Sequence, residues 1–321
     1  MGSLPQILSQ AMSDYQAGRL QNAERLYHEA LAIYPEHPDA LNMLGVIAMR
    51  TGRSSMAGEL FQRAINATPG ISQYHGNLGL ALARQGRLEE AIAAYRKSLS
   101  LKPDYADSYN NLGNALLATG SVSEAVDAFM AAIKHRPDFV EAHSNLGSAL
   151  QKLGKVDEGV AEYRKAIALN PNYAQAHNNL ANGLRDLGKI DGACAELRTA
   201  MRLAPGNTAI GSNYVYTMSY HPATGSEDLC RAERQWNQQH AAPLSKLIAN
   251  HSNERNPDRK LRIGYISGDF RDHIAGKMIL PLLLHRNREQ FEVLCYYNGV
   301  QSDETTAKFR AQSDGFRSIV G

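Results

Sequence analysis

Apolar and polar positions along the first two thirds of the chain follow a helical spacing that restarts every 34 residues. Prolines mark the interval at Pro35, Pro69, Pro103, Pro137, Pro171 and Pro205. Glycines keep the same interval at Gly18, Gly52, Gly86, Gly120, Gly154 and Gly188. Because two residue types share one period, the pattern predicts stacked structural repeats. With each proline as the third residue from a repeat's end, the six units are 4–37, 38–71, 72–105, 106–139, 140–173 and 174–207.

Each unit has the pattern of a helical hairpin. Four units carry a Leu-Gly pair in the first half, such as Leu78-Gly79, and the period glycine then ends the first helix. The second half places a small and an aromatic residue four positions apart, as in Ala91 and Tyr95, so that both lie on one face of a second helix. The proline ends that helix because it cannot continue one. The chain is therefore predicted to be mainly α.

Leu-Gly, Gly, Ala, aromatic, Ala and Pro in this register resemble the signature of tetratricopeptide (TPR) repeats over residues 4–207. The first unit departs from the signature, because Gln10 and Ala11 stand at the Leu-Gly positions. The resemblance implies a right-handed superhelix whose first helices line the concave side. The apolar residues of the pattern are interpreted as the solenoid core.

One polar position of the repeat is not required for packing. An asparagine precedes the leucine of the pair in four consecutive units, at Asn77, Asn111, Asn145 and Asn179. An amide is both donor and acceptor, so a column of amides can bind the backbone of an extended polypeptide without reading its side chains. We therefore expect these four amides to lie free on the concave face and to bind a peptide; the alternative is that they cap or bridge neighbouring helices. Asn110 and Asn178 do not recur in every unit and are interpreted as ordinary surface groups.

After Asn207 the 34-residue pattern ends. Residues 208–258 are expected to form a helical and loop connector. Within it, the composition predicts a polar helix around Glu227–His240 and a loop from Asn250 to Asp258.

Residues 259–321 have the pattern of an α/β domain. Alternating apolar residues predict strands at Leu261–Ser267 and Phe291–Tyr297, helices are expected at Met278–His285 and Thr305–Gln312, and a third strand at Phe316–Val320. This order predicts a parallel sheet, as at the start of a Rossmann-like lobe. So few strands cannot bury both faces of a parallel sheet, so we expect the lobe to be incomplete and the chain to be cut inside a larger domain.

The segment LRIGYISGDFRDH at 261–273, followed by FEVLCY at 291–296, resembles the opening of the catalytic region of protein O-GlcNAc transferases, including bacterial and SPINDLY-like members. His221-Pro222 and the helix with Trp236 and His240 resemble the region that joins repeats to catalytic lobe in the bacterial members, and the family also carries the asparagine column. The resemblance implies two Rossmann-like lobes, a nucleotide-sugar donor, no metal, inversion at the anomeric carbon and transfer to Ser or Thr.

By the same resemblance, His273 matches the active-site histidine of the family. It follows the first predicted strand, where open α/β sheets place their chemistry, and an imidazole there can orient or deprotonate an acceptor hydroxyl. Asp269 is interpreted as a residue that hydrogen-bonds the loop. Arg271, Asp272 and Ile274 stand where animal members have Gly, Asn and Pro, so the shape of this loop is expected to differ from theirs.

Composition adds few constraints. Thirty-four Lys and Arg against 32 Asp and Glu give a net charge of +2, which favours neither nucleic acid nor an anionic membrane as partner. The three cysteines have no CxxC pair, which predicts neither a disulfide framework nor a metal site. No apolar run is long enough to span a membrane, and a cytoplasmic location is expected.

The leading hypothesis is the amino-terminal part of a protein O-GlcNAc transferase, in which the solenoid holds an extended acceptor polypeptide and UDP-GlcNAc is a substrate rather than a cofactor. This chain alone is expected to be inactive. One alternative is a SPINDLY-type O-fucosyltransferase that uses GDP-fucose. Another is a non-catalytic TPR scaffold that carries a degenerate remnant of a transferase. The sequence leaves the acceptor, the donor and the oligomeric state open.

Overall fold

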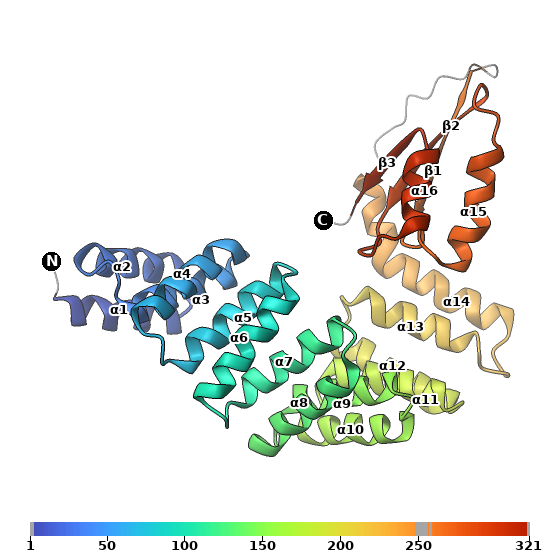
Figure 1. The fold of residues 1–321 in the computed structure, drawn as a ribbon. Helices are drawn as coiled ribbons and strands as arrows, with labels where there is room; N and C mark the ends of the chain where they lie inside the picture. The colour runs from blue at the N-terminus through green and yellow to red at the C-terminus, as the bar shows by residue number, and fades with distance from the viewer. Residues whose placement is uncertain (1–2, 248–255, 257–258, 320–321) are drawn as a thin grey trace. The chain divides into compact units, whose positions relative to one another are not determined.

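A computed structural model describes residues 3–247, 256 and 259–319 (Figure 1). The chain divides into two compact units, residues 1–247 and 248–321. The first unit is helical and the second is an α/β unit.

Residues 4–203 form twelve helices, two in each 34-residue unit, which confirms the predicted hairpins. Figure 1 shows the pairs stacked one after another along the chain. The helices are α1 Leu4–Gln16, α2 Leu20–Ile33, α3 Pro38–Arg50, α4 Ser54–Ala67, α5 Ser72–Arg84, α6 Leu88–Leu101, α7 Ala106–Ala118, α8 Val122–His135, α9 Val140–Lys152, α10 Val156–Leu169, α11 Ala174–Asp186 and α12 Ile190–Leu203. They are called the solenoid below.

The period glycines make the turn inside each hairpin. All six have a positive φ between 71° and 87°, a region that L side chains rarely adopt. The residue after the glycine then donates its N–H back to the first helix, as from Arg53 to the carbonyl of Ala48 at 2.8 Å. This is the hydrogen bond that closes a helix end around a left-handed glycine.

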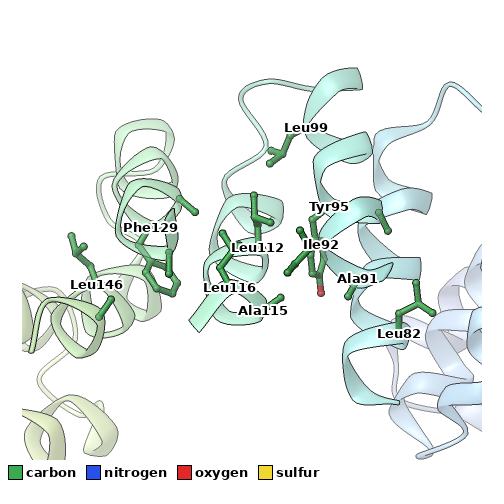
Figure 2. Close-up of a cluster of buried hydrophobic side chains, with 14 of the residues drawn as sticks. Leu82, Ala91, Ile92, Tyr95, Leu99, Leu112, Ala115, Leu116, Phe129 and Leu146 are labelled. Atoms are coloured by element: carbon green, nitrogen blue, oxygen red, sulfur yellow. The ribbon is translucent and has the colours of Figure 1, made fainter. Parts of the chain in front are cut away.

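The Leu-Gly glycines have a different role, because the aromatic ring of the second helix lies directly on them. A Cβ on Gly79 would lie 2.6 Å from the ring of Tyr95, and one on Gly113 would lie 2.6 Å from Phe129. Figure 2 shows the adjoining core, where Ile92 and Tyr95 of α6 belong to one buried cluster with Leu112 of α7. Small residue and large ring are therefore complementary within one hairpin.

First helices of neighbouring repeats also pack on each other, as α5 does on α3 and on α7, whereas the second helices do so less. The inner side of the solenoid is thus formed by first helices. Ser98 stands at the alanine position of the third repeat and is fully buried. Its hydroxyl is hydrogen-bonded to Ser72 and Ser108 at 2.9 and 2.8 Å, which satisfies a polar group inside the core.

Beyond the repeats, the helical unit continues through α13 Thr208–Met218, α14 Ser226–Trp236, a π-helical turn Asn237–Ala241 and a 3-10 turn Ala242–Leu247. Sequence analysis predicted the polar helix but not α13, which packs on α12. Trp236 holds these elements together, since its Nε1 donates to the carbonyl of Thr208 at 3.2 Å and its ring lies against Gly211. The loop predicted at 250–258 lies outside the described residues, apart from Asn256.

In residues 259–319 the strands β1 Leu261–Ser267, β2 Phe291–Tyr297 and β3 Gly315–Ser318 alternate with α15 Ile274–His285 and α16 Glu304–Gln312. The strands are parallel in the order β1-β2-β3, and Leu261 pairs with Phe291, so the predicted βαβ order is confirmed. Helix α15 begins four residues before the expected start, because His273 caps it.

One face of this sheet is covered. Val293 and Cys295 of β2 pack with Phe270, Leu283 of α15 and Phe309 of α16 in a buried cluster. Helices α15 and α16 also contact each other.

Candidate functional site

The four predicted asparagines lie on first helices, Asn77 on α5, Asn111 on α7, Asn145 on α9 and Asn179 on α11. All four are half-buried. The residue one position earlier in each repeat is buried, and it is Asn, Gly or Ser. The solenoid therefore carries two adjacent columns of small or polar residues on its first helices.

Hydrogen bonds connect the two columns across repeats. The Nδ2 of Asn77 donates to Oδ1 of Asn42 at 2.8 Å, and the Nδ2 of Asn145 donates to Oδ1 of Asn110 at 2.9 Å. Asn179 Nδ2 lies 3.3 Å from the hydroxyl of Ser144. The expectation that these amides are free is wrong for the nitrogens of Asn77, Asn145 and Asn179, which bridge neighbouring repeats.

The interpretation of Asn110 and Asn178 as surface groups is also wrong. They are 7% and 8% exposed, and each accepts a hydrogen bond from the following repeat. The buried carbonyl of such an amide needs a donor, and the next repeat supplies it.

Asn111 differs from its three counterparts. The residue opposite it in the preceding repeat is Gly76, which has no side chain to accept a hydrogen bond. Among the described residues, the amide of Asn111 has no hydrogen-bond partner, and neither have the Oδ1 atoms of Asn77 and Asn145. One whole amide and two carbonyl oxygens thus remain to bind a peptide, and that assignment stays a prediction.

Sequence analysis missed a fifth member of the column. Asn213 lies on α13, 34 residues after Asn179, and its Nδ2 donates to Oδ1 of Asn178 at 2.9 Å. The interval of 34 could have found it. It was overlooked because the proline and glycine markers of the repeat end before α13.

His273 lies at the carboxyl end of β1, in the loop that leads to α15. It is the N-cap residue of α15, and its Nδ1 accepts from the backbone N–H of Ala275 at 3.2 Å. The same nitrogen is 3.6 Å from Oδ2 of Asp269, and the side chain is 45% exposed. The histidine is therefore held at one nitrogen and accessible to solvent.

The loop with His273 is fixed from two sides. Asp303 accepts the N–H of Asp272 at 2.6 Å through Oδ2, and the N–H of Thr306 at 2.9 Å through Oδ1. The first of these hydrogen bonds is the main reason why the pKa of the Asp303 carboxyl is lowered. Asp303 thereby links the loop to the start of α16.

Neither Gly268 nor Gly276 of this loop has a positive φ. Gly276 is needed for a close approach instead. A Cβ on Gly276 would overlap the carbonyl oxygens of Arg271 and Asp269.

The contacts of His273 limit the chemistry that the ring can perform. Because Nδ1 accepts a hydrogen bond, the neutral ring carries its proton on Nε2. To accept a proton at Nε2, the ring must move its own proton to Nδ1, where Asp269 is the nearest carboxylate. A histidine with Nδ1–H directed at a carboxylate is a common general base.

Among the described residues, no group of three His, Cys, Asp or Glu side chains is arranged to hold a metal ion. In the same part of the chain, no helix combines the length and the apolar character needed to cross a membrane. Cys194, Cys230 and Cys295 are free thiols.

Comparison with protein families assigns the helical part. The tetratricopeptide repeat model matches residues 8–71, 110–173 and 144–208, and a further TPR repeat model matches 79–120. The chain belongs to the tetratricopeptide-repeat family. Asn111, Asn145 and Asn179 of this TPR protein lie inside the matched repeats.

A third family model, glycosyl transferase family 41, matches residues 234–317 of the TPR protein. The match includes the loop with His273, the strands β1 and β2 and the first three residues of β3. Repeats and a transferase segment are therefore combined in one chain.

Curated relatives are similar over about a third of the chain. A probable UDP-N-acetylglucosamine–peptide N-acetylglucosaminyltransferase SPINDLY of Hordeum vulgare is 30% identical over 103 residues, which is 31% of this chain and 10% of the relative. The SPINDLY of Arabidopsis thaliana is 30% identical over 100 residues, 31% of this chain and 11% of the relative. The chain thus spans about a tenth of these relatives' length.

Among solved structures, a mutant O-GlcNAc transferase of Thermobaculum terrenum is similar, with a TM-score of 0.58 and 27% identity. The similarity covers 67% of this chain and 41% of that structure. Parts of the TPR protein are therefore similar to O-GlcNAc transferase and SPINDLY proteins.

Proposed function

We propose that this TPR protein belongs to a protein O-glycosyltransferase, in which the solenoid holds an acceptor polypeptide and residues 259–319 are part of the first catalytic lobe. The reaction is transfer of GlcNAc from UDP-GlcNAc to Ser or Thr. The observation that carries the proposal is the combination of TPR repeats with a family 41 segment that has a histidine at the carboxyl end of β1.

The concave face can hold a polypeptide through its backbone. Successive first helices lie roughly 10 Å apart, and an extended chain advances about 3.3 Å per residue, so an asparagine meets about every third residue. Since the Nδ2 groups of Asn77 and Asn145 are used between repeats, their Oδ1 atoms would accept peptide N–H groups. Such contacts at about 1 kcal/mol each allow weak binding of many sequences.

At the loop of β1, His273 would orient or deprotonate the acceptor hydroxyl through Nε2. To deprotonate it, Nδ1 must give up the N–H of Ala275 and turn its own proton to Asp269. The sugar passes to the acceptor oxygen, and the nucleoside diphosphate is the leaving group, held by a second lobe. We propose that no metal takes part in this step. The three free cysteines agree with a reducing compartment, and we place the protein in the cytoplasm.

The test uses the enzyme that combines this chain with the second lobe. It is incubated with a Ser/Thr peptide and either UDP-GlcNAc or GDP-fucose, and the modified peptide is measured by mass spectrometry. We expect transfer from UDP-GlcNAc. Transfer from GDP-fucose alone would show that GDP-fucose is the donor. Transfer from neither donor would favour the non-catalytic TPR scaffold.

The role of the concave face is tested with Asn111→Ala, because this amide takes part in no bridge between described repeats. The variant should raise the KM for a long acceptor peptide about fivefold, the equivalent of one lost hydrogen bond of about 1 kcal/mol. Transfer to a short acceptor that does not reach the solenoid is the control. Equal effects on both acceptors would contradict peptide binding by the column.

A further inference from the structure

Three histidines occupy one repeat position on first helices, His75 on α5, His143 on α9 and His177 on α11. All three are buried, with 8%, 6% and 7% exposed. In each, Nε2 is hydrogen-bonded to the carbonyl of the proline six residues earlier, at 3.0, 3.0 and 2.9 Å. The rings therefore have the same orientation, with Nε2 as donor and Nδ1 directed towards the second helix.

Two of the three rings have a carboxylate at Nδ1. Oε2 of Glu162 lies 2.7 Å from Nδ1 of His143, and Oε2 of Glu196 lies 2.6 Å from Nδ1 of His177. Both glutamates come from the second helix of the same hairpin. Both ring nitrogens face acceptors, an arrangement that only the imidazolium satisfies fully.

The third repeat lacks this carboxylate. Ala94 stands at the position of Glu162 and Glu196, and Nδ1 of His75 has no hydrogen-bond partner among the described residues. The His75 side chain is buried, but this nitrogen is not among the buried side-chain atoms that lack a partner, so it is accessible from outside the chain. The repeat thus keeps the ring and its orientation but not the group that completes the pair.

His75 opens into a groove of about 680 Å³ between α4, α5 and α6. Gly58 and Ala94 have no side chain or a small one and so leave space for the groove, and Leu78 and Leu82 give it an apolar wall. Its size is that of a site for several residues of a peptide rather than a single small ion. Since two second helices form its walls, the groove is distinct from the asparagine column.

We propose that this groove, lined by His75 and Ala94, binds an acidic side chain of a partner polypeptide. The carboxylate takes on Nδ1 of His75 the place that Glu162 and Glu196 hold in the fifth and sixth repeats. In the complex the carboxylate accepts a charge-assisted hydrogen bond from the imidazolium. A ring that is neutral before binding therefore takes up one proton.

The other charges of the groove restrict the partner. Arg87 makes two hydrogen bonds to Glu90 at 2.7 and 2.6 Å, and Arg63 bonds Glu36 at 2.8 Å. Glu59 on α4 is a further negative charge on the wall. One acidic residue between apolar neighbours therefore fits, whereas a run of acidic residues is repelled.

The probes are two acetylated and amidated heptapeptides that differ only in a central Glu or Gln between leucines, with sodium acetate as a third probe. Binding is followed by the long-range ¹H–¹⁵N signals of the His75 ring. We expect the Glu peptide to bind about tenfold or more tightly than the Gln peptide, because the hydrogen bond to a charged group is lost. The affinity of the Glu peptide should rise as the pH falls from 8 to 6, because binding takes up a proton at the His75 ring. The carboxylates and guanidinium groups of the groove, including Glu59, Arg63, Arg87 and Glu90, keep their charge in that range.

The decisive variant is Ala94→Glu, which supplies the missing carboxylate from the chain itself and should abolish binding of the Glu peptide. Ala128→Glu is the matched control, because it makes the same change in the fourth repeat, where Tyr109 stands at the histidine position. That control should bind normally. If Ala94→Glu fails to fold, His75→Tyr, which copies the Tyr109–Ala128 pair, takes its place and should also lose binding.

Three results would overturn the proposal. The first is equal binding of the Glu and Gln peptides, and the second is unchanged binding by Ala94→Glu and His75→Tyr. The third is acetate binding as tightly as the Glu peptide, which would make the groove a site for small anions rather than for a polypeptide.

Discussion

The solenoid and the α/β unit bury their apolar residues in different ways. In the solenoid each ring, such as Phe129, packs within its own hairpin and on the next, and it is fully buried. In the α/β unit Ile274, Met278 and Leu282 on α15 are 72%, 71% and 59% exposed. A stack of repeats closes its core by local contacts, whereas a parallel sheet needs cover on both faces.

Their polar contacts differ in the same sense. Neutral amides bridge the repeats, as Asn145 bridges to Asn110. In the α/β unit the guanidinium of Arg286, only 5% exposed, bonds Asp314 at 2.8 Å. Ion pairs occur in both units, as between Arg53 and Glu24 of the solenoid. The difference is that the solenoid adds neutral amide bridges, whereas the α/β unit pairs a guanidinium that is almost completely buried.

The largest effect is expected from Asp314→Ala, which tests whether the α/β unit depends on this ion pair. Leaving Arg286 buried without its partner should destabilise the α/β unit by about 3 kcal/mol. Hydrogen exchange measured separately on peptides of the two units should show faster exchange in residues 259–319 only. An equally large increase of hydrogen exchange in the solenoid would show that the two units do not unfold independently.

Asp314 also gives a pH dependence. The N–H of Val293 and then Arg286 lower the pKa of its carboxyl, so its contribution is present above the ordinary aspartate value and is lost as pH falls through the lowered one. Asp314→Asn, which keeps the shape, should therefore be less stable than the native chain at neutral pH. The difference should shrink at acidic pH.

His273→Ala tests chemistry rather than stability of the α/β unit. In the enzyme with both lobes, turnover should fall about 10²-fold or more, about 2.7 kcal/mol of barrier, if the ring moves a proton. The alanine also removes the N-cap of α15, at a cost of about 1 kcal/mol. His273→Asn keeps a cap and not the base, so it should retain the melting temperature and lose turnover. An active Asn variant would end the catalytic assignment.

Gly113→Ala tests the packing of a ring on its glycine inside one hairpin of the solenoid. The new methyl group would lie 2.6 Å from the ring of Phe129, and such overpacking should cost about 2 kcal/mol in urea unfolding. Gly120→Ala is the control inside the same hairpin. It meets no atom within 4 Å but has a φ of 87°, so it should cost about 1 kcal/mol through backbone strain. If Gly120→Ala cost more than Gly113→Ala, strain rather than packing would limit the repeat.

The smallest effect separates two members of the asparagine column. Asn145→Ala leaves the buried carbonyl of Asn110 without its donor and should cost about 1 kcal/mol or more. Asn111→Ala removes no such bridge, so its unfolding free energy should change by less than about 0.5 kcal/mol. Equal costs for the two variants would show that the bridge contributes nothing.

Sequence patterns predicted most elements of both units. The bounds of β1 and β2 agree with the predicted strands, and every hairpin turn falls at a period glycine. Helix α13 was not predicted because the proline and glycine markers of the repeat end before it, and its packing on α12 is seen only in the structure. The start of α15 was misplaced because the cap is a histidine, which is not among the usual N-cap residues.

The sequence by itself determined the repeat, because glycine and proline act on their own backbone and a small residue and a ring four apart share one helix face. It also determined the strand order, since alternation and crossover rules are local. Only the tertiary structure decided what each polar residue does. Asn111 and Asn145 have the same place in the repeat, yet their roles depend on Gly76 or Asn110, 35 residues earlier. His75 and His143 likewise differ through Ala94 or Glu162, because a hydrogen bond depends on the partner that the fold brings within 3 Å.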